Sequence, residues 1–234
     1  MSDAFHPRFW VVVPAAGVGS RMRADRPKQY LQLADRTILE HTLDCFLDHP
    51  GLNGLVVSVA AGDPYWLSLG CATDSRVKRA VGGAERADSV LAALTSLSES
   101  GADANDWVLV HDAARPNLAR SDLERLLAEL ADDPVGGLLA VPVRDTLKRA
   151  SPDGRVLETV DRSVIWQAYT PQMFRLGMLR DALAGALAAG VAVTDEASAL
   201  EWASQSPRLI EGRADNLKIT RPEDLDWLQR RWSS

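Results

Sequence analysis

The chain has 234 residues, enough for one large domain, and its 46% hydrophobic and 25% charged residues are typical of a folded globular protein. Its 32 acidic residues outnumber 26 Lys and Arg, and the net charge of −6 disfavours nucleic acid or an anionic membrane as a partner, because both attract a basic surface. No apolar run approaches the roughly 20 residues that span a bilayer, and the short run near residue 9 does not fit a secretory signal. We therefore expect a cytoplasmic protein with Cys45 and Cys71 reduced, although the sequence leaves a disulfide between them open.

The first 130 residues alternate between strand and helix patterns. Short apolar runs rich in β-branched residues predict buried strands at residues 9–13, 55–60, 76–81 and 107–110. Capping boxes and a helical repeat of apolar residues predict helices at residues 37–47, 87–97 and 121–130. This order is typical of an α/β fold with a Rossmann-like, doubly wound and mostly parallel sheet, in which ligands bind at the carboxyl ends of the strands.

The second half opens with a predicted strand at residues 138–143 and then changes character. Residues 146–150 and 155–160 predict two strands joined by the turn Ser151-Pro152-Asp153-Gly154. Later patterns predict a helix at 176–187, a helix that follows Thr194 as its N-cap, strands at 208–211 and 216–219, and a last helix at 220–232. We expect a single domain over residues 1–234.

Residues 144–162 form a hairpin arm within this predicted domain. A hairpin of two strands is only marginally stable by itself, so the arm must pack on its own subunit or reach a partner. The sequence alone leaves both placements open. Our prediction is an arm that reaches the partner subunit of a homodimer.

The loop after the first strand has the most informative chemistry. Ala15, Ala16, Gly17 and Gly19 let the backbone approach a ligand, and successive N–H groups in such a loop suit phosphate oxygens. A P-loop would need Gly-Lys-Ser/Thr, and a dinucleotide fingerprint would need a small residue at Met22. Four cations follow within eight residues of an otherwise acidic chain: Arg21, Arg23, Arg26 and Lys28. The loop therefore predicts a phosphate site that is neither a P-loop nor a dinucleotide fingerprint. The simpler alternative, a turn with solvated basic residues, stays open.

The ordered combination of a strand, Ala-Ala-Gly-x-Gly, Arg and Pro-Lys resembles the nucleotidyltransferases that join a nucleoside triphosphate to a sugar or polyol phosphate. Five later segments narrow the resemblance: GGAERADSV at 82–90, VHDAARP at 110–116, PVRDT at 142–146, TDEASA at 194–199 and GRADNLKIT at 212–220. They occur in the right order over about residues 10–228. Together they are similar to the 2-C-methyl-D-erythritol 4-phosphate cytidylyltransferases of the non-mevalonate isoprenoid pathway.

The resemblance implies an enzyme that transfers CMP from CTP to 2-C-methyl-D-erythritol 4-phosphate and releases pyrophosphate. A phosphate oxygen of the acceptor would attack the α-phosphorus of CTP, so catalysis would rest on positioning and charge stabilisation rather than on a protein nucleophile. Arg21 and Lys28 would be the catalytic residues. Mg²⁺ or another divalent cation would bridge the triphosphate oxygens, with Asp112 as a candidate further ligand.

The resemblance also assigns two binding regions. Nucleotide contacts would come from Ala15, Ala16, Gly17, Gly19, Gly83, Ala84, Ser89, Asp112 and Ala113. Acceptor contacts would come from Arg115, Thr146, Arg162, Thr170, Thr194 and Lys218. Thr146 and Arg162 would reach across the dimer on the arm, while Thr170 and Thr194 would contact the polyol or the nucleotide. Many family members carry an acidic residue where this chain has Ala84.

Three other functions compete with this interpretation. Ribitol 5-phosphate cytidylyltransferases resemble the chain across the same motifs and differ in their acceptor contacts. A nicotinamide-dependent oxidoreductase is disfavoured by Met22 in the third fingerprint position. A non-catalytic nucleotide-binding protein would be expected to lack Arg21, Lys28 or Asp112, and all three are present.

Overall fold

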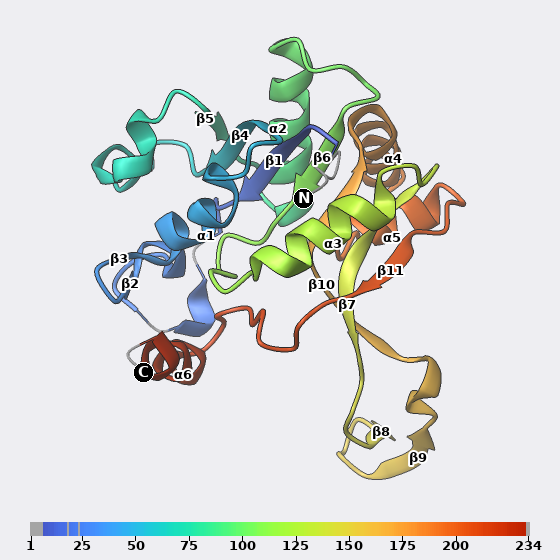
Figure 1. Ribbon diagram of the computed structural model, residues 1–234. Coiled ribbons are helices and arrows are strands. Elements are labelled where there is room, and N and C mark those ends of the chain that lie inside the picture. The colour runs from blue at the N-terminus through green and yellow to red at the C-terminus, as the bar shows by residue number, and fades with distance from the viewer. Residues whose placement is uncertain (1–6, 18, 23, 233–234) are drawn as a thin grey trace, which may run out of the picture.

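The structure, a computed structural model, describes residues 7–17, 19–22 and 24–232. Its centre is a seven-stranded sheet in the order β11-β7-β10-β6-β1-β4-β5 (Figure 1). Among the described strands of this sheet, β10 runs antiparallel to both its neighbours and every other pairing is parallel. The strands are β1 (Phe9–Pro14), β4 (Leu52–Val59), β5 (Val77–Val81), β6 (Trp107–Val110), β7 (Gly136–Pro142), β10 (Trp166–Arg175) and β11 (Arg208–Glu211). The prediction of an α/β fold with a mostly parallel sheet is confirmed.

Helices cover both faces of the sheet (Figure 1). One face is covered by α1 (Ile38–Leu47) and α3 (Arg120–Leu130). The other face is covered by α2 (Arg86–Glu99), α4 (Leu176–Ala188) and α5 (Glu196–Trp202). The last helix, α6 (Pro222–Trp232), lies away from these layers and packs through Leu228 on Met22 and Ile219, so it supports the loop after β1.

β1 is buried on both sides, as its unbroken apolar run predicts. Val11 and Val13 pack in the cluster that contains α1 and α3, whereas Val12 packs in the cluster that contains α2 and α4. Successive side chains of a strand point to opposite faces, so a central strand needs apolar residues at every position. This burial fixes where β1 ends and therefore where the glycine-rich loop begins.

Two of the predicted helix starts are wrong. The capping box of α1 is confirmed, because Thr37 Oγ1 accepts from the Glu40 N–H at 3.2 Å and Glu40 Oε2 accepts from the Thr37 N–H at 3.0 Å. Ser121, however, lies inside α3, whose N-cap is Ala119. Thr194 lies one residue before the N-cap of α5, which is Asp195; its carboxylate accepts from the Ser198 N–H at 3.0 Å.

The sequence analysis missed β10 and predicted a strand that does not form. Pro171 lies within β10, where the register to β7 shifts between Ala168 and Gln172, and a proline inside a run argues against a central strand. Residues 216–219 form no strand. Their backbone instead bonds to the loop after β6, with the Ile219 N–H donating to the Ala114 carbonyl at 2.8 Å.

The hairpin arm is present and projects away from the sheet (Figure 1). Its strands β8 (Leu147–Ala150) and β9 (Val156–Val160) pair only with each other among the described strands. Val156 and Leu157 are 63% and 62% exposed, so the arm leaves apolar surface uncovered within one chain. A second small ribbon is formed by β2 (Gln32–Leu33) and β3 (Arg36–Thr37).

The structure answers the open question about the two cysteines. Cys45 and Cys71 are both free thiols, so the disulfide between them does not form. Burial raises the pKa of each thiol to about 12, which leaves both protonated and unreactive near neutral pH. Within the described ranges, no helix combines the length and the apolar character needed to cross a bilayer.

Candidate active site

A cavity of about 300 Å³ opens at the carboxyl end of the parallel strands. We call it the first cavity. The loops after β1, β5 and β6 line it, as the fold predicts for a ligand site, and Lys218 from the segment after β11 also lines it. Its lining includes the following predicted residues: Ala15, Ala16, Gly17, Gly19, Arg21, Lys28, Gly83, Ala84, Ser89, Asp112, Ala113 and Lys218. Val18 and Arg23, which belong to the same loop of the sequence, lie outside the described residues.

The loop after β1 is held in place by Gln29. The Gln29 Nε2 amide donates to the Ala15 carbonyl at 2.6 Å and to the Gly17 carbonyl at 3.2 Å. Gly19 has a φ of +64°, and a Cβ there would lie 2.8 Å from Lys28 Cγ. A side chain at this position would therefore be strained and would displace the stem of Lys28. Sequence reasoning did not single out Gln29, and its position next to Lys28 was the only available signal.

Lys28 is a partly buried cation of this loop. Its Nζ donates to the Ile219 carbonyl at 2.8 Å. Burial, followed by repulsion from Lys218, lowers the pKa of Lys28 to about 8, although Asp112 opposes this shift. Arg21 lines the same cavity with an exposed side chain. Arg21 and Lys28 therefore bring one solvated and one partly buried cation to the cavity, which Arg86 and Lys218 also line.

The loop before α2 closes the opposite side of the cavity. The Gly83 N–H donates to Ser89 Oγ at 3.1 Å, and this hydroxyl donates to the Glu85 carbonyl at 3.1 Å. A Cβ on Gly82 would lie 2.5 Å from the Ala16 Cβ, so only glycine lets the two loops approach this closely. Ser89 thus fixes the shape of the loop that presents Gly83 and Ala84 to the cavity.

Asp112, two residues after the end of β6, is the centre of the charge network. Its Oδ1 pairs with Arg86 Nε at 3.2 Å, and its Oδ2 pairs with Arg115 Nε at 3.2 Å and with Lys218 Nζ at 3.0 Å. Burial alone would raise the pKa of this carboxyl. Attraction to Arg86, Lys218 and Arg115 outweighs burial and holds its pKa well below the usual range. Asp112 is therefore ionised and engaged, as the cost of a buried carboxylate requires.

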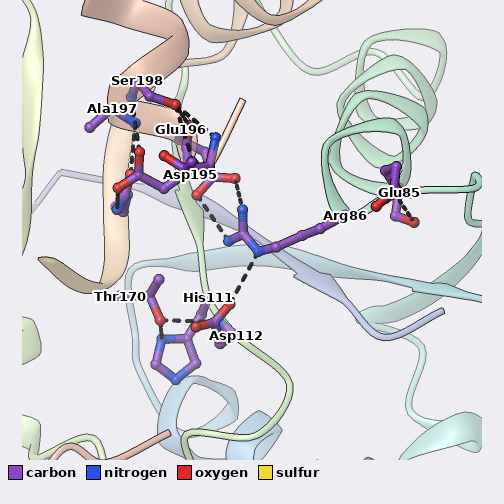
Figure 2. A network of polar contacts seen from close by, with 12 residues as sticks. Glu85, Arg86, His111, Asp112, Thr170, Asp195, Glu196, Ala197 and Ser198 are labelled. Carbon is purple, nitrogen blue, oxygen red and sulfur yellow. Dashed lines mark hydrogen bonds and ion pairs between the residues drawn. The ribbon is translucent and has the colours of Figure 1, made fainter. Parts of the chain in front are cut away.

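Arg86 and Glu196 complete this network, and neither was given a role from the sequence (Figure 2). Arg86 Nη1 and Nη2 donate to Glu196 Oε1 and Oε2 at 2.7 and 3.1 Å, while Nε reaches Asp112. This bidentate pair joins the first residue of α2 to the first residue of α5. Both residues stand in motifs that carry the family resemblance, which was the only signal available.

A second cavity of about 280 Å³ adjoins the first. Both cavities are lined by Arg86, Asp112 and Lys218, so these side chains form a shared wall. Four of the six predicted acceptor residues line the second cavity: Arg115, Thr170, Thr194 and Lys218. The Arg115 guanidinium lies 4.6 Å from the centre of the Tyr169 ring and donates to the Asn216 carbonyl at 2.6 Å, which fixes its plane.

Two predicted residues are not brought to this site within one chain. Thr146 and Arg162 are exposed on the arm and line neither cavity. Arg162 instead donates to the Arg144 carbonyl at the base of the arm. Their assignment to a neighbouring subunit's site stays a prediction.

The described residues do not by themselves form a metal site. Across the chain segments that the structure describes, no three His, Cys, Asp or Glu side chains gather in a way that would hold an ion. Asp112 does not fit as a metal ligand in this arrangement, because both carboxylate oxygens already pair with cations.

A mostly parallel sheet with a small-residue loop, a partly buried Lys and an adjoining cavity lined by Arg and Lys is typical of a nucleotidyltransferase. Comparison with known proteins identifies which kind. The model of the IspD family, 2-C-methyl-D-erythritol 4-phosphate cytidylyltransferase, matches residues 9–229. The chain belongs to this family, and it is an enzyme of the cytidylyltransferase class.

Relatives and solved structures agree with this assignment. A 2-C-methyl-D-erythritol 4-phosphate cytidylyltransferase of Pseudomonas fluorescens Pf-5 is 73% identical over 234 residues, covering 100% of this chain and 99% of the relative. One of Ectopseudomonas mendocina is 75% identical over 225 residues, covering 96% of each chain. A crystal structure of the Francisella tularensis enzyme has a TM-score of 0.82 at 35% identity, covering 97% of this chain and 100% of the other. The ribitol and nicotinamide alternatives are not favoured, since none of these proteins carries such a name.

Proposed function

We propose that this chain transfers CMP from CTP to 2-C-methyl-D-erythritol 4-phosphate, with CTP in the first cavity and the acceptor in the second. The observation that carries this proposal is the shared wall of Arg86, Asp112 and Lys218. Two anionic reactants held in adjoining cavities would meet across that wall, where cations outnumber carboxylates. Proximity of this kind supplies a large part of the rate in reactions between two substrates.

The reaction needs positioning and charge stabilisation. A phosphate oxygen of the acceptor forms a bond to the α-phosphorus of CTP, and the bond from that phosphorus to the bridging oxygen breaks, releasing pyrophosphate. Arg21 and Lys28 would stabilise the negative charge that develops on the phosphoryl oxygens and on the leaving group. Gly83 would read the cytosine edge through its carbonyl and Ala84 through its backbone, since the Gly83 N–H and the Ser89 hydroxyl hydrogen are both used within the loop.

The second cavity suits a phosphorylated polyol. Lys218 pairs with Asp112 at 3.0 Å and is partly exposed, so its ammonium can turn toward an incoming phosphate. Arg115 is fixed by Tyr169 and Asn216 and adds a second positive charge. Thr170 and Thr194 would contact the hydroxyl groups. Asp112 would serve as the counter-ion that holds these cations in place before the acceptor arrives.

A divalent cation, Mg²⁺ or a similar ion, would enter as part of the nucleotide substrate. Triphosphate oxygens are the hard ligands that such ions prefer, and bound there the ion neutralises charge on the chain of phosphates. Removing divalent cations with EDTA should therefore abolish pyrophosphate release, and added MgCl₂ should restore it. Turnover that persists in EDTA would contradict this proposal.

The arm would complete the acceptor site of a partner subunit. Arg162 carries a charge that lines neither cavity of its own chain, and the arm exposes Val156 and Leu157 for burial against a second copy. We also propose the cytoplasm as the compartment, where the free thiols of Cys45 and Cys71 stay reduced. Residues 1–234 would then form a single domain, and the hairpin arm of each subunit would pack on the other subunit of the dimer.

Mixed dimers test this arrangement. Lys28→Met and Arg162→Ala are each expected to be nearly inactive as homodimers. A dimer of one copy of each should contain one intact site, made of the body with Lys28 and the arm with Arg162, so coexpression should restore pyrophosphate release. Mixed dimers as inactive as their parents would contradict the exchanged arm.

Substrate selection tests the proposed function itself. Pyrophosphate release is measured with CTP, UTP, ATP and GTP, each with 2-C-methyl-D-erythritol 4-phosphate or with ribitol 5-phosphate. We expect CTP with methylerythritol phosphate to exceed every other pair by at least about 10² in kcat/KM. Preference for ribitol phosphate, or for another nucleotide, would overturn the proposal.

A further inference from the structure

A buried chain of hydrogen bonds joins His111, Thr170 and Asp112 (Figure 2), and the last two of these residues line the second cavity. His111 Nε2 lies 3.0 Å from the Arg115 carbonyl, and His111 Nδ1 lies 3.0 Å from Thr170 Oγ1. A carbonyl oxygen only accepts, so Nε2 carries the hydrogen and donates it to Arg115. In a neutral imidazole the other nitrogen then has no hydrogen and must accept. The Thr170 hydroxyl is therefore the donor to His111.

The surroundings keep this ring neutral and fixed. His111 is fully buried, and burial lowers its pKa to about 4; Asp112 opposes this shift, while Arg115 and Arg86 add to it. The ring also packs edge-on against Phe46, with 5.1 Å between the ring centres. A single tautomer is thus selected over the neutral pH range.

In this arrangement the Thr170 hydroxyl has no hydrogen left to donate to a ligand. Its single hydroxyl hydrogen goes to His111, and one lone pair accepts the Asp112 N–H at 3.1 Å. The remaining capacity of the oxygen is a second lone pair, which can only accept. Thr170 lines the second cavity together with Lys218 and Arg115, both of which can only donate.

We propose that His111 is a positioning residue that restricts the Thr170 hydroxyl to accepting, so that the second cavity selects a ligand with a hydroxyl donor beside its phosphate. The proposal rests on the proposed function for the identity of the ligand. The cations of the cavity pair with the phosphate, and the threonine oxygen pairs with a hydroxyl group of the polyol. A ligand oxygen without a hydrogen would meet a lone pair at Thr170 and be rejected.

Fluorinated analogues of the acceptor substrate test whether Thr170 accepts a hydrogen bond from a substrate hydroxyl, since fluorine accepts weakly and never donates. Acceptor analogues carry fluorine in place of each hydroxyl in turn, and kcat/KM is compared with that of the parent compound. In the wild-type enzyme one substitution should lower kcat/KM by at least about tenfold. Thr170→Val should remove that selectivity, because it lacks the oxygen, whereas Thr170→Ser should retain it. Equal discrimination in the wild type and in Thr170→Val would overturn the proposal.

The tautomer of His111 is measured independently of activity. Nitrogen-15 NMR of the histidine rings, assigned with a His111→Gln variant, should show a neutral His111 with hydrogen on Nε2 and none on Nδ1 at neutral pH. A hydrogen on Nδ1 would overturn the proposal, even if Thr170→Val changes selectivity. Failure of the proposed function is recognised separately, as absent turnover of the parent acceptor by the wild-type enzyme while the tautomer signal is as expected.

Discussion

Replacing Lys28 with methionine is expected to lower kcat by about 10²–10³ while changing the Kd for CTP far less. The side chain lies in the first cavity beside Arg21, and burial makes its charge more effective toward a phosphoryl group than the charge of a solvated lysine. Lys78→Met is the control, because Lys78 is an exposed lysine on β5 that lines neither cavity. Stopped-flow turnover and calorimetric CTP binding separate the two effects. A kcat near that of the wild type would remove the catalytic role of Lys28.

The same lysine predicts the alkaline limb of the pH profile. The pKa of Lys28 is lowered to about 8, so the ammonium is charged below that pH and neutral above it. Since kcat/KM reports the ionisation of the free enzyme, kcat/KM for CTP should fall as pH rises through about 8. Lys28→Arg keeps its charge, and its profile should lack this limb whatever its absolute rate. If kcat/KM of Lys28→Arg falls at the same alkaline pH as that of the wild type, the fall belongs to another group.

Glu196→Ala is expected to give the largest loss of stability, about 3–5 kcal/mol in the free energy of unfolding. The side chain of Glu196 is 2% exposed and that of Arg86 is 29% exposed, so the substitution leaves a largely buried guanidinium without its bidentate partner and with only the single bond to Asp112. The measurement is urea-induced unfolding. The matched control is Glu129→Ala, which removes the exposed pair between Glu129 and Arg208 and should cost at most about 1 kcal/mol.

Glu196 also acts on the site through Arg86. Without the carboxylate, the guanidinium is free to move away from Asp112, and the shared wall loses its geometry. Glu196→Gln retains one acceptor oxygen and should recover part of the stability. Equal losses in Glu196→Ala and Glu129→Ala would show that the buried pair does not hold the helices together.

The sequence predicted local features of the fold well. The β-branched run of β1 and the Thr37 capping box are formed by neighbouring residues, so their patterns are visible along the chain. β10 was missed because Pro171 disrupts the pattern of a central strand, and its burial comes from partners that are distant in sequence. The shift from Thr194 to Asp195 as N-cap reflects two adjacent residues that can both cap a helix.

The site was predicted in the same uneven way. Arg21 and Lys28 follow β1 directly, so a single loop pattern locates both beside the small residues. The pair of Arg86 and Glu196 spans 110 positions, and no spacing along the chain predicts a contact of that range. The network around His111 was not foreseen either, because it depends on a threonine of the strand that the sequence did not predict.

The most direct test of the account is a crystal structure of the protein with CTP. We expect the triphosphate to lie in the first cavity, within hydrogen-bond distance of Arg21 and Lys28, with the cytosine against Gly83 and Ala84 and the second cavity left for the acceptor. A complex in which the triphosphate binds at the second cavity, or away from both cavities, would contradict the assignment of the loop after β1 as the triphosphate site that carries the catalytic residues.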